Sequence, residues 1–130
     1  MRFQSRRFVS TTGGISQREL AKSGRRERIV DSATALLREI GMDALSVTSI
    51  AERAGVSPAT VYNLFGTKAA ILQQVFDRDL REYEKLVEKA RARDTLERIF
   101  KAVGIAASLY RADPGFYRAM MHGSRRGDAR

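Results

Sequence analysis

The stretch SVTSIAERAGVSPATVYNLFGTK, residues 46–68, decides the fold of this chain. It holds two short helical patterns joined at Gly55, where a residue without a side chain adopts the left-handed conformation without steric penalty. Ser46 is suited to cap the first helix. Apolar residues at i, i+3, i+4 and i+7 predict that one face of this helix is buried: Val47, Ile50, Ala51 and Ala54.

The second pattern begins at Ser57-Pro58, a capping serine followed by a proline at the first helical position, where no N–H is needed. Val61, Leu64 and Phe65 are predicted to face inward. The residues left outside are small, hydroxyl-bearing, amide-bearing or aromatic, and none is acidic: Pro58, Ala59, Thr60, Tyr62 and Asn63. Two helices at a steep angle, the second with such a face, predict a helix-turn-helix that enters the major groove of DNA.

Helical patterns continue on both sides of this stretch. Upstream, residues 25–40 predict a helix that ends at Gly41, with an apolar stripe along one face: Ile29, Ala33, Leu36, Leu37 and Ile40. Downstream, Thr67 is predicted to cap a long helix that reaches Val87, and Asp94 to cap another. Asp113-Pro114 predicts a further short helix, and the sequence from Gly123 onward is typical of a polar tail.

These elements predict an all-α chain. Residues 25–72 are expected to form a three-helix, homeodomain-like helix-turn-helix head. Residues 73–130 are expected to add a long linking helix and one or two helices of an incomplete regulatory and dimerisation domain. Its aromatic and methionine side chains are either core or the lining of a ligand cavity, because Met packs adaptably: Phe116, Tyr117, Met120 and Met121.

Composition favours a polyanionic partner. The 130 residues carry a net charge of +9 and contain no Cys, which excludes disulfides, thiol nucleophiles and thiolate metal sites. Residues 1–24 hold five cationic residues and a single acid, and are predicted to form a flexible basic arm that is either a plain leader or a contact to DNA. No apolar run is long enough to span a membrane. No pattern of catalytic residues or metal ligands stands out, so neither an enzyme nor a cofactor is predicted.

Residues 28–75 resemble the DNA-binding domain of the TetR (tetracycline-repressor-like) family of bacterial transcription regulators. The matching residues keep fixed spacing over the whole segment: Ile29, Ala33, Leu36, Gly41, Ser46, Val47, Ile50, Ala51, Ala54, Gly55, Val56, Ser57, Thr60, Val61, Tyr62, Phe65, Lys68 and Leu72. The resemblance implies that Lys68 contacts the DNA backbone. Many members have His at the position of Asn63, so a contact from Asn63 to a base is not implied by the family.

The predicted DNA contacts fall into two groups. Pro58, Ala59 and Asn63 are expected to face base edges, where Pro and Ala meet a thymine methyl and Asn pairs with adenine. The others are expected to hold phosphates and set the register: Thr48, Ser57, Thr60, Tyr62 and Lys68. Arg25 and Arg26 are also predicted to contact phosphates. They lie in the first turn of a helix, where cations are unfavourable unless phosphates lie nearby, the alternative being plain solvation by water.

The function predicted is a sequence-specific DNA-binding regulator, a cytoplasmic repressor that acts as a homodimer on a palindromic operator. The resemblance implies control by a small-molecule effector. Typical members of the family are longer, and their C-terminal helices form both the effector pocket and the dimer interface. If such helices are missing, apolar residues are expected to be left partly exposed: Ile105, Leu109, Tyr110, Phe116 and Met120. The alternative is a truncated helical interaction module, or a competitor that lacks productive DNA regulation.

Overall fold

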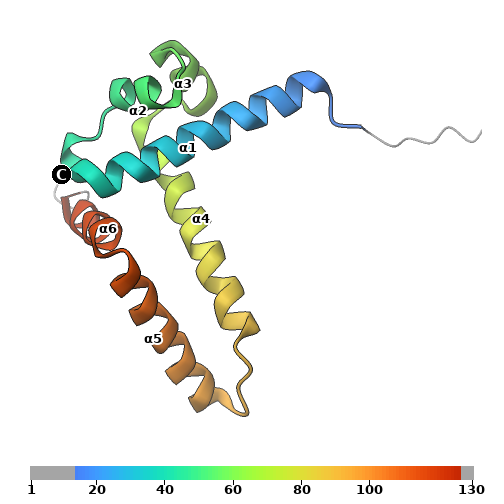
Figure 1. Ribbon diagram of the computed structural model, residues 1–130, viewed down its shortest axis with the longest axis vertical. Coiled ribbons are helices and arrows are strands. Elements are labelled where there is room, and N and C mark those ends of the chain that lie inside the picture. Colours follow the sequence, from blue (N-terminus) through green and yellow to red (C-terminus); the bar gives the residue numbers. More distant parts are fainter. Residues whose placement is uncertain (1–13, 127–130) are drawn as a thin grey trace, which may run out of the picture.

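The computed structural model describes residues 14–126, with side chains placed from residue 14 to residue 121, and this part of the chain forms six helices and no strand. The all-α prediction is therefore confirmed. Helix α2 packs against α1, and α3 packs against α2 and the start of α4. Helix α4 leads away from them, α5 returns toward the head, and α6 lies against α1 (Figure 1). The helices are α1 (Gln17–Ala44), α2 (Val47–Ala54), α3 (Pro58–Phe65), α4 (Lys68–Lys89), α5 (Thr95–Ala112) and α6 (Pro114–Arg126).

Helix α1 begins at Gln17, eight residues before the start expected at Arg25. Ser16 caps it: the Ser16 hydroxyl accepts from the Glu19 N–H, and the Glu19 carboxylate accepts from the Ser16 N–H. This reciprocal pair satisfies two backbone donors and is a capping box. Residues 17–23 are nevertheless exposed, so this end of the helix is held by its cap and not by packing. The first 13 residues of the predicted basic arm lie outside the described residues.

The other end of α1 bends at Gly41, whose φ of 78° and ψ of 175° are open only to glycine. The helix resumes for a short turn to Ala44, where a plain crossing was expected. The prediction that Ile40 belongs to the core stripe is wrong, because this side chain is 45% exposed. The stripe instead ends at Leu37, and Leu45 turns inward after the bend and is buried.

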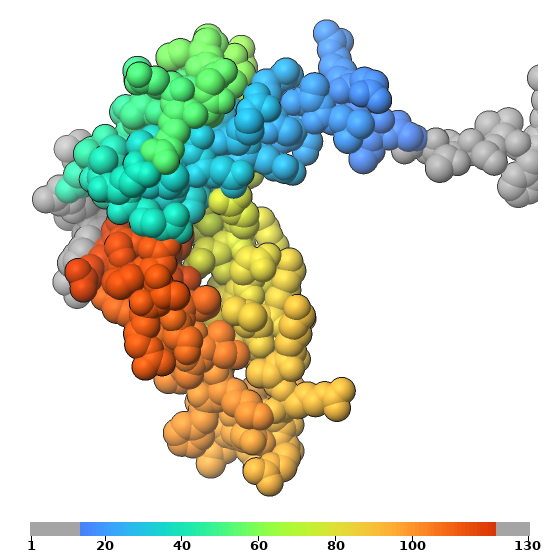
Figure 2. Space-filling view, in the orientation of Figure 1, coloured from blue at the N-terminus to red at the C-terminus, as the bar shows by residue number. Residues whose placement is uncertain are grey.

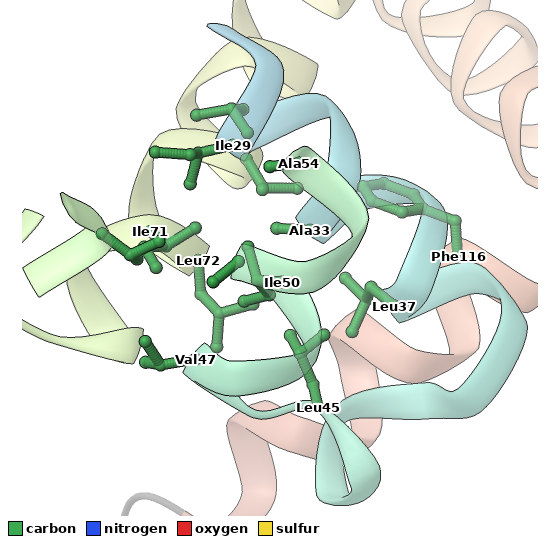
Figure 3. Close-up of a cluster of buried hydrophobic side chains, with 14 residues drawn as sticks. Ile29, Ala33, Leu37, Leu45, Val47, Ile50, Ala54, Ile71, Leu72 and Phe116 are labelled. Atoms are coloured by element: carbon green, nitrogen blue, oxygen red, sulfur yellow. The ribbon is translucent and has the colours of Figure 1, made fainter. Parts of the chain in front are cut away.

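The core lies where α1, α2 and α4 meet, and Phe116 of α6 closes it (Figure 3). The inward residues predicted for α2 are all buried, and Val61 anchors α3 with Leu64 and Phe65 packed at the edge. From α4, Ile71, Leu72 and Val75 complete the cluster. Burial of these side chains from water supplies the main stabilisation of the head, because short helices are not stable alone.

Helix α6 packs on α1, so it shares one core with the helix-turn-helix head. Phe116 is only 4% exposed, which corrects the expectation that it is left open. Arg38 of α1 donates from Nε to Asp113 Oδ2 at 2.5 Å, and Asp113 also accepts from the Phe116 N–H. Burial, together with a 3.0 Å hydrogen bond from Tyr117 Oη to Asp79, raises the pKa of Tyr117 to about 12. The polar tail expected from Gly123 is helical as far as Arg126.

Helix α5 contributes no buried residue to the core. Asp94 caps it as predicted, accepting from the Glu97 N–H at 2.8 Å, but the Glu97 side chain accepts from Arg93 instead of returning to the cap. Four apolar side chains that recur at helical spacing along α5 are 55–69% exposed: Leu96, Ile99, Phe100 and Val103. This apolar face is not covered by any other helix within residues 14–121.

Candidate DNA-binding surface

The turn between α2 and α3 is fixed by backbone geometry. Gly55 has a φ of 68°, in the left-handed region, and the N–H of Val56 bonds to the Ala51 carbonyl at 3.0 Å. At the start of α2, Ser46 and Ser49 each accept the other's backbone N–H at 3.1 Å. A turn satisfied in this way fixes the angle at which α3 leaves α2.

Helix α3 presents one exposed face, which we call the outer face, formed by Pro58, Ala59, Tyr62 and Asn63. Tyr62 is 54% exposed, although it is a large aromatic side chain. Helices α2 and α3 lie together on one side of α1, whereas α5 and α6 lie on the other side (Figure 2). The outer face carries no acid, so nothing on it repels a phosphate backbone.

The hydroxyls at the start of α3 are already engaged with each other. Ser57 Oγ accepts from the Thr60 N–H at 3.1 Å and lies 2.9 Å from Thr60 Oγ1. This is the predicted cap, and it leaves spare hydrogen-bonding capacity on each hydroxyl. Thr48 is exposed in the first turn of α2. These three hydroxyls therefore lie at the starts of α2 and α3.

Three of the cations predicted to contact DNA differ in their surroundings. Arg26 donates from Nη1 to the Leu64 carbonyl at 2.7 Å, and Lys68 donates from Nζ to the Leu45 carbonyl at 3.0 Å. Arg25 makes no hydrogen bond or ion pair within residues 14–121 and is half-buried. Lys68 keeps two further N–H donors, so a phosphate contact remains open to it.

Further cations tie the head together through contacts distant in sequence. Arg53 of α2 pairs with Glu39 of α1 at 2.6 Å. Arg78 of α4 pairs with Asp31 at 2.5 Å and also donates to Thr34 Oγ1. The sequence holds no local signal for these pairs, because the partners are separated by long segments. All are partly exposed, so each adds orientation more than stability.

Other kinds of site find no support in residues 14–121. No cluster of potential metal ligands is present there, and no buried side-chain nitrogen or oxygen lacks a partner. Among the described helices, none combines the length and apolar character required to cross a bilayer. The exposed outer face of α3, with Arg25 and Lys68 on the neighbouring helices, is therefore the candidate site.

Comparison with known proteins gives a consistent result. Residues 29–75 match the family described as bacterial regulatory proteins, tetR family. The transcriptional repressor KstR of Rhodococcus jostii (strain RHA1) is 28% identical over 112 residues, which cover 86% of this chain and 53% of that protein. The regulator YdeS of Bacillus subtilis (strain 168) is 45% identical over 53 residues, or 41% of this chain and 27% of YdeS.

Among solved structures, a TetR-family transcriptional regulator from Haemophilus influenzae Rd has a similar fold. The TM-score is 0.54 at 23% identity, over 73% of this chain and 53% of that chain. The chain thus spans about half the length, or less, of these three proteins.

Proposed function

Because this chain belongs to the tetR family of bacterial regulatory proteins, we propose that it is a DNA-binding transcriptional regulator that places α3 in the major groove of an operator. The observation that carries this proposal is the exposed, acid-free outer face of α3, held on a buried scaffold. KstR of Rhodococcus jostii is named as a transcriptional repressor, which supports repression as the direction of control.

The outer face provides the contacts that such a function needs. Pro58 and Ala59 offer apolar contact to a thymine methyl, and Asn63 has the geometry to pair with adenine. The remaining groups hold phosphates and set the register: Arg25, Thr48, Ser57, Thr60, Tyr62 and Lys68. A single head makes few contacts, so useful affinity calls for two heads on a palindrome with half-sites about one helical turn apart. Such a homodimer acts in the bacterial cytoplasm, where the operator lies.

An effector site is proposed in the apolar groove of about 430 Å³ between α4, α5 and α6. Its volume is in the range of small-molecule pockets. It is lined mainly by aromatic and aliphatic side chains: Phe76, Leu80, Tyr83, Leu109, Tyr110, Tyr117, Met120 and Met121. Asp77 and Asp79 are the only charged residues in this lining. The ligand class favoured is therefore an apolar molecule with few polar groups.

The alternative function is an interaction module without productive DNA binding. The exposed apolar side chains of α5 are what such a module would use. The outer face of α3 favours the regulator, because a head released from DNA binding has no need to keep an aromatic residue exposed there while excluding acids.

The decisive experiment is selection from randomised duplex DNA, followed by sedimentation of the purified chain with the selected duplex. We expect enrichment of a palindrome, occupied by two chains. Log affinity should fall with log salt, with a slope of about −0.9 per neutralised phosphate. A salt-independent affinity or the absence of any selected sequence would remove the proposal, and the interaction module would then be favoured.

Substitutions on the outer face should separate the two kinds of contact. We expect Asn63→Ala to change the preference among sites by about 1–3 kcal/mol, because it removes a base contact. Tyr62→Ala, its neighbour, should weaken binding to all sequences alike, because it removes a positioning contact. Competition between the selected duplex and single-base variants measures both effects. An unchanged site preference in Asn63→Ala would assign that residue to another role.

A further inference from the structure

Arg26 occupies an unusual place for a cation near a proposed DNA surface. It belongs to α1, yet its guanidinium lies at the carboxyl end of α3. Nη1 donates to the Leu64 carbonyl at 2.7 Å, and the guanidinium carbon lies 4.6 Å from the centroid of the Phe65 ring. Both groups that it contacts are thus in the last two residues of α3.

Each of these contacts stabilises the carboxyl end of α3. The last four carbonyls of a helix lack helical partners, and Leu64 is among them. A cation at this end also meets the negative end of the helix dipole, and stacking over Phe65 adds a cation–π attraction. A helix of eight residues is too short to be stable alone, so its position depends on such external contacts.

The position of the carboxyl end governs the outer face. Helix α3 packs mainly on α2 and α4, and its fully buried anchor is Val61. Leu64 and Phe65 pack only at the edge of the core, so the hydrogen bond and the ring contact from Arg26 add a restraint at the carboxyl end of the helix. Because α3 is only about 12 Å long, a small shift of Leu64 moves the residues proposed to contact bases by a comparable distance. Displacement of that size disrupts hydrogen bonds to base edges.

We propose that Arg26 is a positioning residue that holds α3 in the orientation needed for base contacts, and that it is not a phosphate contact. This inference rests on the proposed function, because it assumes that α3 enters the groove. It also accounts for a cation in the first half of α1 without invoking DNA. Arg26 then contributes to the selection of sequence and contributes nothing to the salt dependence of binding.

The test compares Arg26→Gln with wild type on the selected duplex and on an unrelated duplex across a salt series. We expect a loss of about tenfold in affinity for the selected duplex, the size of a lost hydrogen bond to a charged group. Affinity for the unrelated duplex and the salt slope should be unchanged. If Arg26 contacts a phosphate, both affinities fall together and the slope becomes shallower by about 0.9; that result overturns the inference.

Two further variants keep the result interpretable. Phe65→Leu removes the stacking partner without altering charge, and it should reproduce the loss of selectivity. Combined with Arg26→Gln it should add little further loss, because both substitutions remove the same restraint on α3. Arg26→Lys keeps the charge but not the planar group, so it should remain less selective, whereas a phosphate contact would be restored. Full selectivity in Phe65→Leu contradicts the inference. Circular dichroism establishes that each variant is folded.

A failure of the proposed function looks different. In that case the wild-type chain itself selects no sequence and shows no salt dependence, before any variant is compared.

Discussion

Ile50→Ala is expected to lower the free energy of unfolding by about 2–5 kcal/mol. Ile50 is fully buried in α2 and lies in the cluster where side chains of α1 and α4 converge (Figure 3). Its truncation removes apolar contacts and leaves a cavity that close-packed neighbours fill only in part. Urea unfolding followed by circular dichroism measures the change, which is a large fraction of the stability of a small domain.

Ile40→Ala is the matched control for this prediction. It deletes the same atoms from a helix that also belongs to the head, but Ile40 is 45% exposed. The expected change is within about 0.5 kcal/mol. Equal losses from the two substitutions would show that the core does not extend as described, and that Ile40 is buried in solution by some other surface.

The helix-turn-helix itself was predictable because its signals are local. Ser46, Gly55, Ser57 and Pro58 each stand at a helix boundary, and each has the conformation that its chemistry prefers. The buried face of α2 was also predictable from local sequence. A two-turn helix has one inward face, and the spacing of its apolar residues shows which face that is. The exposed outer face of α3 followed from the residues that remained.

The start of α1 could also have been found. Ser16 followed three residues later by Glu19 is the pattern of a capping box, and the structure forms that box. The prediction of a flexible basic arm over residues 1–24 left this capping pattern out. The error at Ile40 has another cause, since periodicity does not show where a bend removes the last turn of a helix from the core.

The groups that the cations contact could not be predicted from the sequence. Arg26 contacts a carbonyl 38 residues away, and Lys68 contacts one 23 residues away. Neither partner is a side chain, so no pattern of residue types marks the contact. Basic residues near a DNA-binding motif are assigned to phosphates by charge alone, whereas the fold decides which of them hold the protein together. The roles of Arg25, Thr48 and the outer face in binding DNA stay predictions.

Ala59→Glu is expected to abolish selective DNA binding, with a loss of about 100-fold or more, while leaving the fold intact. Ala59 is exposed in the first turn of α3, on the outer face. A carboxylate there is brought against base edges and phosphates, and like charges placed together in an interface cost several kcal/mol. The same carboxylate lies at the positive end of the α3 dipole, so it should stabilise the helix by about 0.3–1 kcal/mol.

Ala59→Glu is a sharp test of the outer face, because it is expected to weaken DNA binding while stabilising the helix. Most changes that weaken binding also weaken the fold, whereas this one should raise the melting temperature slightly and remove binding. Ala107→Glu is the matched control, because it changes the net charge equally at an exposed position of α5, on the other side of α1 from α3 (Figure 1). Its affinity should fall only by the weak, screened effect of one distant charge. If both variants lost affinity to the same extent, net charge alone would explain binding and α3 would not be the element in the groove.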